Sequence, residues 1–237
     1  MMWRLSTIDA RKNIHIQHFT QKGQRMIMKT RNEVHLTGGI VRIRASKSVT
    51  LLTIATTVAG VATAFPTIVF YEPKKTKGFE IGDRVTVDAH IQLHIGRDEN
   101  GKTTNYSQDI VGDKICKAQR MLAPFITDET VSKTEGGVRS DENYAYIFGR
   151  VRHVYNAPNG VVILSVSVPR EDNRFDSCEI ACFRRQADVA RMLEEGDCVM
   201  VGGVVQTRNG KTKDDRTAQN VACRDIVKCE GFEDLPH

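Results

Sequence analysis

The chain has 237 residues, of which 40% are hydrophobic and 27% are charged, and its formal net charge is +5. This balance is typical of a soluble globular protein and excludes disorder along the whole chain. The charge is uneven, because residues 1–30 carry six Lys and Arg against one acidic residue, whereas residues 121–237 carry fifteen against nineteen. A local basic excess permits binding to a polyanion but does not require it.

Residues 1–30 share nothing with the segments that follow, so we expect a basic N-terminal arm there. A strand-like pattern then starts at Asn32 and runs into Gly38, and a glycine inside a strand commonly marks a bend where a sheet curls into a barrel. The stretch from Ser48 to Tyr71 has no charged residue and is long enough to cross a membrane as a helix. Its threonines, β-branched residues, glycine and proline favour two strands joined by a loop instead.

Three landmarks of this first segment recur later in the chain in the same order. They are a glycine that ends the first strand, a Gly-Asp turn before the fourth strand and a glutamine that opens the fifth: Gly38 and Gly149, Gly82 and Gly196, Gln108 and Gln219. The residue numbers within these pairs differ by 111, 114 and 111. Self-similarity at a nearly constant spacing indicates an internal repeat.

Each repeat unit contains five short predicted strands. We therefore predict a mainly all-β fold of two tandem five-stranded OB-fold barrels, at residues 31–120 and 143–229. A polar linker at residues 121–142 separates them, and a short acidic tail follows at residues 230–237. The second barrel is expected to have a helix between strands three and four, over Arg185–Gly196, because its apolar residues have helical spacing. The first barrel has only a short loop at that point.

The six cysteines include no Cys-x-x-Cys pair, which indicates reduced thiols in a cytoplasmic protein without a metal or cofactor. One zinc-binding alternative stays open, since four of them could converge as ligands: Cys178, Cys182, Cys223 and Cys229. The sequence has no phosphate-binding glycine loop, no His-Glu-x-x-His motif and no nucleophile elbow. We therefore expect a protein that is not an enzyme.

The second unit resembles bacterial and phage single-stranded DNA-binding proteins. The run Ile180-Ala-Cys-Phe-Arg-Arg185, then the predicted helix, then Glu195-Gly-Asp and a strand reaching Gln-Thr-Arg208, follows the order of that family's central stretch. The resemblance implies an OB barrel that stacks bases of single-stranded DNA on aromatic side chains within a basic groove, and it leaves binding to RNA open. It also implies a stacking role for Phe183, to which Tyr71 and Phe65 correspond in the first unit. Serine and glycine, Ser177 and Gly210, stand where the family has tryptophans.

Basic residues after the strand-one glycine occur in both units, and we expect them at equivalent places facing the phosphates, with a plain solvated face as the alternative. For the phenylalanines the alternative is core packing. The candidate nucleic-acid-binding residues are Arg42, Arg44, Phe65, Tyr71, Lys74, Lys75, Tyr106, Arg150, Arg152, Tyr155, Phe183, Arg184, Arg185, Arg208 and Lys211.

The C-terminal tail resembles the family's partner-recruiting tip, although His237 replaces the terminal aromatic residue. Its candidate partner-binding residues are Glu233, Asp234, Leu235 and Pro236. We predict a protein that coats or protects single-stranded DNA in replication, recombination or repair, in the cytoplasm of a bacterium or in phage infection, as a homo-oligomer and specifically a dimer. Two alternatives remain: an OB-fold module that binds primosome or recombination proteins and nucleic acid only weakly, and a membrane-tethered form of the fold.

Overall fold

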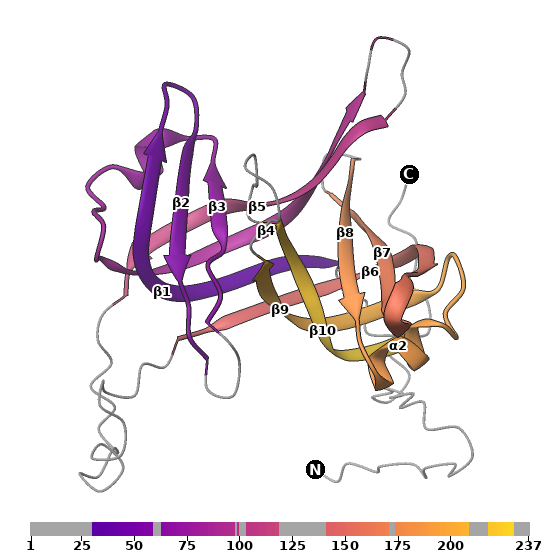
Figure 1. The fold of residues 1–237 in the computed structure, drawn as a ribbon. Helices are drawn as coiled ribbons and strands as arrows, with labels where there is room; N and C mark the ends of the chain where they lie inside the picture. Colours follow the sequence, from indigo (N-terminus) through magenta and orange to yellow (C-terminus); the bar gives the residue numbers. More distant parts are fainter. Residues whose placement is uncertain are drawn as a thin grey trace, which may run out of the picture.

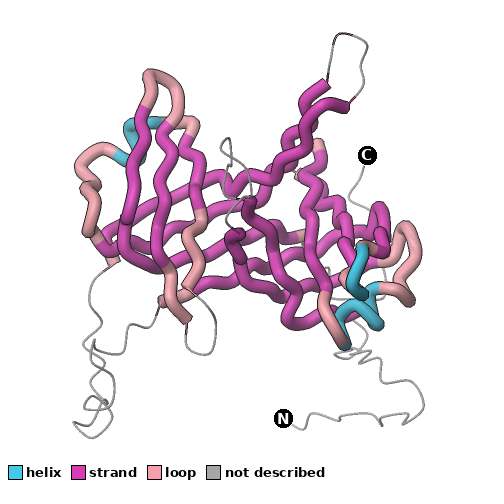
Figure 2. Tube along the Cα trace, viewed as in Figure 1, coloured by secondary structure: helices cyan, strands magenta, loops and turns pink. Residues whose placement is uncertain are grey.

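The computed structural model describes residues 30–58, 63–97, 99, 103–118, 141–170, 174–208 and 218–229. The expected N-terminal arm and acidic tail and most of the linker lie outside these residues. Strands make up most of the described chain, and its short helical segments lie at the periphery of the strands (Figure 2). The strands are β1 (Arg31–Ala45), β2 (Thr50–Ala55), β3 (Thr67–Phe70), β4 (Arg84–Arg97), β5 (Thr103–Lys117), β6 (Asn143–Asn156), β7 (Val162–Pro169), β8 (Phe175–Cys182), β9 (Cys198–Arg208) and β10 (Ala218–Cys229).

Strands β1 to β5 form a closed barrel (Figure 1). β1 pairs with β2, β2 with β3, β3 runs parallel to β5, β5 pairs with β4, and β4 returns to β1. Closure leaves no strand edge within this group unpaired. The five-stranded order, with its single parallel contact, is that of an OB-fold.

The charge-free stretch forms β2 and β3 rather than a helix. Alternate residues such as Leu52 and Ile68 are fully buried in the core, while Thr53 and Thr67 face outward. This period of two is the pattern of a strand with one buried face. No helix among the described residues is long and apolar enough to cross a membrane.

Strands β6 to β10 pair in the corresponding order. β6 pairs with β7, β7 with β8, β8 runs parallel to β10, β10 pairs with β9, and β9 pairs with β6. The helix α2 (Arg185–Ala190) lies between β8 and β9, and the 3-10 turn η1 (Pro73–Thr76) follows β3 where a loop was expected. A second 3-10 turn, η2 (Pro158–Gly160), joins β6 to β7.

The helix α2 is shorter than the sequence predicted. It ends at Ala190, and the chain then turns at Gly196, where φ is +91° and Asp197 Oδ2 accepts a hydrogen bond of 2.9 Å from the N–H of Glu194. Beyond its end, Met192 is 53% exposed, whereas Leu193 is buried. The same turn closes at Gly82 before β4, with φ +98°.

The two groups of strands meet through β1 and β6, which pair antiparallel from Arg31 opposite Phe148 to Leu36 opposite Asn143. In this ladder Val34 lies opposite Ala145, and these residue numbers differ by 111, the offset of the first landmark. Exchanging the two halves therefore maps this pair onto itself, as at the centre of a two-fold symmetric contact.

The strand-one glycines lie at corners where the backbone of a neighbouring strand approaches closely. A Cβ on Gly38 would lie 2.2 Å from the carbonyl oxygen of Ala55, and one on Gly149 would lie 2.3 Å from that of Ser167. Only glycine fits such an approach, so both landmarks have the same steric cause.

The Gly-Asp turns are matched in the same way. Asp83 lies 3.1 Å from Lys117 Nζ, and Asp197 lies 2.7 Å from Lys228 Nζ. The pKa of Asp197 is lowered: burial raises it, but the hydrogen bonds from Lys228 and from the N–H of Glu194, with the charge of Lys228, outweigh burial. Each Gly-Asp turn is therefore joined by an ion pair to the last strand of its group, β5 or β10.

The last two residues of the expected linker are docked on the first barrel. Asp141 forms an ion pair of 2.5 Å with Arg84 and accepts a 2.7 Å hydrogen bond from the N–H of Thr57. The carbonyl of Glu142 accepts a 2.8 Å hydrogen bond from the N–H of Thr37. Residues 141 and 142 therefore contact the first group of strands through side-chain and backbone atoms.

Candidate nucleic-acid interface

The outer face of β1, β2 and β3 carries a basic edge beside a polar centre. Arg44 lies opposite Leu51, and Arg42 lies opposite Thr53. Thr53 in turn lies opposite Thr67, and their hydroxyl oxygens are 2.9 Å apart. Both arginines are exposed, so their guanidinium groups are accessible to a phosphate on this face.

Tyr71 follows β3 at the end of the same face and is 47% exposed. Its hydroxyl oxygen lies 3.2 Å from His94 Nε2, and His94 lies 3.4 Å from Asp109. Burial, and after it the charge of Asp109, raises the pKa of Tyr71, so the phenol keeps its proton. The ring is held at its hydroxyl end and open to solvent elsewhere.

The corresponding face of β6, β7 and β8 is more aromatic. Tyr155 lies opposite Ile163 and is 62% exposed, and His153 lies opposite Ser165. Phe183 follows β8 as Tyr71 follows β3, and its side chain is half-buried. The two aromatic residues predicted from the second unit, Tyr155 and Phe183, therefore belong to one three-stranded face.

The structure corrects the predicted equivalence of the arginines. Counted from the two glycines, and with a bulge at the same place in β1 and β6, Arg42 corresponds to His153 and Arg44 corresponds to Tyr155. Arg152 is exposed at the bulge, and Arg150 Nη1 donates a 3.4 Å hydrogen bond to the carbonyl of Gly196. The similar spacing of the arginines in the two units was coincidental.

Phe175 is a candidate that sequence reasoning missed. It begins β8 and is 64% exposed. Because Cys178 and Ile180 are buried, the alternation along the strand places Phe175 on the same outer side as Ser177 and Glu179. That alternation was readable in the sequence from Phe175 to Phe183.

Two predicted lysines are already paired. Lys74 and Lys75 lie 3.0 and 3.1 Å from the carboxylate oxygens of Glu72, and hydrogen bonds from these lysines lower the pKa of Glu72. Arg184, which precedes α2, and Arg185, its first residue, are both exposed, and Arg184 has a φ of +51°. The lysines therefore contribute less positive charge than their number suggests.

Phe65 lies where the two halves of the chain meet. It is 45% exposed, and its N–H donates a 3.0 Å hydrogen bond to Thr207 Oγ1 of β9. Nearby, the side-chain amide of Gln219 donates to the carbonyl of Thr67 and accepts from the N–H of Thr67, both at 3.0 Å.

Gln108 makes the matching contact from the first half to the second half. Its amide donates to the carbonyl of Glu179 at 3.2 Å and accepts from the N–H of Glu179 at 2.6 Å. The long β4–β5 hairpin therefore lies against β8, and β10 lies against β3 (Figure 1). Each half flanks the candidate face of the other, which the sequence did not predict.

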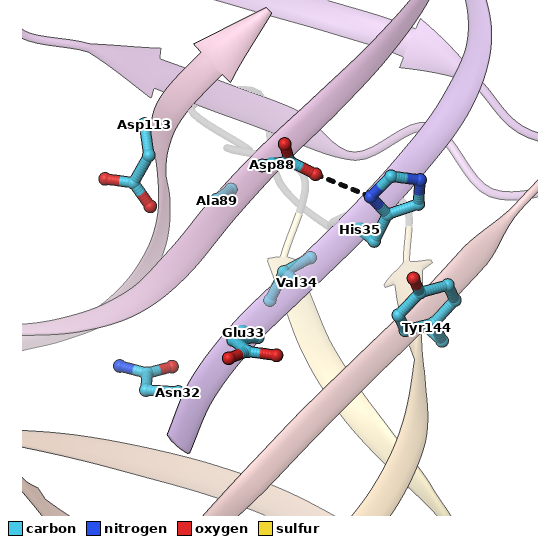
Figure 3. A pocket seen from close by; sticks show the side chains of 8 residues that line it. All are labelled: Asn32, Glu33, Val34, His35, Asp88, Ala89, Asp113 and Tyr144. Carbon is cyan, nitrogen blue, oxygen red and sulfur yellow. Dashed lines mark hydrogen bonds and ion pairs between the residues drawn. The ribbon is translucent and has the colours of Figure 1, made fainter. Parts of the chain in front are cut away.

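A cavity of about 280 Å³ lies beside the β1–β6 ladder, and its chemistry is acidic (Figure 3). Glu33, Asp88 and Asp113 contribute carboxylates to its lining. His35 Nδ1 lies 2.6 Å from Asp88 Oδ1, and Nε2 lies 2.8 Å from Glu142 Oε2. The His35 ring also stacks on Tyr144, with centroids 5.1 Å apart. The carboxylates make this cavity unsuitable for phosphate.

Four of the five cysteines of the second half lie in two adjacent pairs, and the fifth, Cys178, is buried in β8. Cys198 lies opposite Cys229 in the β9–β10 ladder, and Cys182 adjoins Cys223 where β8 runs beside β10. Within the described part of the chain, no three His, Cys, Asp or Glu side chains are placed to hold a metal ion. The zinc alternative therefore has no support in the described residues.

Several candidates cannot be placed on either face. Tyr106 pairs with Ile95, and Arg208 pairs with Ala218, through backbone positions only, because the side chains of Tyr106 and Arg208 lie outside the described part of the structure. Other candidates lie wholly outside the described residues: Lys211, Glu233, Asp234, Leu235 and Pro236.

Comparison with known proteins gives a likeness of fold. No family model and no curated protein matches the sequence. Among solved structures, the wild-type single-stranded DNA binding protein from Thermus aquaticus matches with a TM-score of 0.60 and 14% identity, over 89% of this chain and 98% of that one. A deletion variant of the same protein matches with a TM-score of 0.58 and 17% identity, over 88% and 98%. The chain therefore shares the OB-type fold of solved single-stranded DNA-binding proteins.

Proposed function

We propose that this chain binds single-stranded DNA without catalysing a reaction, along the outer faces of β1–β3 and β6–β8. The observation that supports the proposal most is the recurrence of one arrangement. In both halves an aromatic residue follows the third strand, Tyr71 or Phe183, on a face whose first strand presents a cationic or aromatic group, Arg44 or Tyr155. Stacked bases and neutralised phosphates are the two contributions that bind single strands without sequence preference.

We also infer that the two halves are copies of one OB-type barrel in tandem. The matching strand orders, the matched Gly38 and Gly149 corners and the self-equivalent Val34–Ala145 pair support this inference. The copies have diverged on their binding faces, so the first is suited to phosphates and the second to bases. We place the barrels at residues 31–120 and 143–229.

The biological role we propose is the coating and protection of single-stranded DNA in replication, recombination or repair. The solved proteins of the same fold are named for single-stranded DNA binding, which supports this assignment. Recruitment of partner proteins by residues 233–236, assembly into a dimer and a site of action at the nucleoid are further parts of the proposal.

The deciding experiment is fluorescence anisotropy with labelled oligo-dT and a duplex of the same length, each at a low and a high salt concentration. Tight binding that prefers the single strand and weakens with salt is the expected result. The proposal fails if neither nucleic acid binds at low salt.

A second candidate function is an OB-fold module that binds a protein partner and binds nucleic acid only weakly. The pairing of Lys74 and Lys75 with Glu72, and the presence of Glu179 on the second face, favour it because they reduce the positive potential. Salt-sensitive binding that is equally weak for single strand and duplex would support this candidate.

A further inference from the structure

Two thiols lie side by side in the core of the second half. β8 and β10 run parallel, with Ile180 beside Val221 and Ala181 beside Ala222, so the next pair along the ladder is Cys182 and Cys223. Both are free and belong to the same buried core, with exposed fractions of 0% and 6%. Adjacent strands are about 4.8 Å apart. This spacing falls within the range of roughly 4.4 to 6.8 Å between the Cα atoms of a disulfide.

The first half has a phenylalanine and a glycine where the second half has Cys182 and Cys223. The corresponding residues are Phe70 on β3 and Gly112 on β5, which follow the Val69–Val111 pair. The Phe70 ring fills the space in front of Gly112, since a Cβ on Gly112 would lie 2.2 Å from Phe70 Cε1. In the second half two sulfur-bearing side chains occupy the place of one ring and one hydrogen.

We propose that Cys182 and Cys223 form a reversible disulfide, so that the second half contains a redox-sensitive fastening between β8 and β10. With hydrogen peroxide as oxidant, one thiolate attacks a peroxide oxygen and becomes a sulfenic acid. The second thiol sulfur then displaces hydroxide from it, and overall two thiols and one peroxide give a disulfide and two waters. Two exchange steps with a dithiol reverse the reaction.

The environments of the two thiols assign their roles. A hydrogen bond from Cys223 lowers the pKa of Cys182, although burial opposes it, whereas the same hydrogen bond and then burial raise the pKa of Cys223. Cys182 is therefore the thiolate that attacks, because the thiolate is the nucleophilic form. Cys223 is the resolving thiol.

The position of the bond gives it a mechanical consequence. The paired residues of β8 and β10 are only Ile180 with Val221 and Ala181 with Ala222, the shortest ladder among β6 to β10. A covalent bond next to this ladder closes the ring of five strands at its weakest contact. A disulfide stabilises further by constraining the unfolded chain between its cysteines. This inference does not depend on what the protein binds.

The test uses the full chain, which is first reduced and then treated with hydrogen peroxide under native conditions. The solvent-exposed thiol of Cys116 serves as the internal marker, and treatment continues for several hours after it has reacted. Remaining thiols are alkylated in denaturant, and fragment mass spectrometry reads the linkage, because Cys178 and Cys182 share one tryptic peptide. We expect a Cys182–Cys223 link and a rise in Tm by roughly 5 to 15 °C that dithiothreitol reverses.

Two variants separate this pair from the other cysteines. Cys223→Ala should abolish both the link and the oxidative rise in Tm, while the double variant Cys198→Ala/Cys229→Ala should keep both. If Cys182 and Cys223 of the wild-type chain remain open to alkylation after Cys116 has reacted, the proposal is overturned. A link that joins only Cys198 to Cys229 overturns it equally.

Discussion

Replacing Arg42 and Arg44 together by alanine should weaken binding to single-stranded DNA in a way that depends on salt. Both side chains are exposed on the outer face of β1, and neither forms an ion pair with any carboxylate among the described residues. If each arginine neutralises one phosphate, the double variant neutralises two fewer phosphates and releases correspondingly fewer counterions. The slope of log K against log salt concentration should then fall in magnitude by about 1.4, at about 0.7 per phosphate of a single strand.

Tyr155→Ala should behave differently, because the proposed role of its exposed ring is to stack on a base, and the ring carries no charge to neutralise a phosphate. Loss of one stacked base costs about 1 to 3 kcal/mol, which is roughly a 5- to 150-fold loss of affinity. The loss should be similar at every salt concentration, and the slope should stay that of the wild type. The two variants therefore separate the contributions of the two faces.

The assay is an anisotropy titration of labelled oligo-dT at four or more salt concentrations for each variant. Lys114→Ala is the control for charge, because Lys114 is exposed on β5 beside Asp88 and away from both faces. Tyr144→Ala is the control for aromatic area on the cavity side of the β1–β6 ladder. An unchanged slope in the arginine variant, or an equal change in Lys114→Ala, refutes the assignment of phosphates to this edge.

Three further variants test the framework that carries the faces. Gly149→Ala should lower the free energy of unfolding by about 1 to 3 kcal/mol, because its Cβ would lie 2.3 Å from the Ser167 carbonyl oxygen. Gly202→Ala is the control, because the nearest atom to its Cβ would be 3.8 Å away, and urea unfolding should show little change in its stability. Gln219→Ala should cost about 1 to 3 kcal/mol by leaving two backbone groups of β3 without their partner, and hydrogen exchange should quicken there first. The lowered pKa of Asp197 means that its ionised form stabilises the fold above the unfolded-state pKa of about 3.9, and that this stability is lost as pH falls through the lower folded-state value. Asp197→Asn should therefore flatten the acid side of the stability profile below about pH 4, and an unchanged profile would contradict the role given to this turn.

The parts of the fold that the sequence predicted are those with a local cause. Gly38 and Gly149 stand out in strand patterns because a neighbouring carbonyl leaves no room for a Cβ. Gly82 and Gly196 stand out because the turn needs a positive φ. Each such requirement acts on a single residue, so the spacing of these glycines predicted that one order of strands would recur, as it does in β1–β5 and β6–β10.

The equivalence of the arginines was predicted wrongly, because the two units were matched by residue type rather than by position. Counting four and six residues on from Gly38 and from Gly149 pairs Arg42 with His153 and Arg44 with Tyr155. The structure keeps this alignment, because the bulge lies at the same place in β1 and β6. Phe175 could likewise have been found from the alternation of β8 alone.

The contacts between the halves explain why two unequal faces could act on one strand of DNA. Gln108 reaches the backbone of β8, and Gln219 reaches the backbone of β3, so each amide holds the other half at its third strand. Those third strands are followed directly by Tyr71 and Phe183, the two aromatic positions on which the proposed stacking depends. A contact that fixes the halves therefore also fixes the separation of the stacking residues. Because both amides bond to backbone groups, this coupling does not depend on the side chains that make the first face basic and the second aromatic.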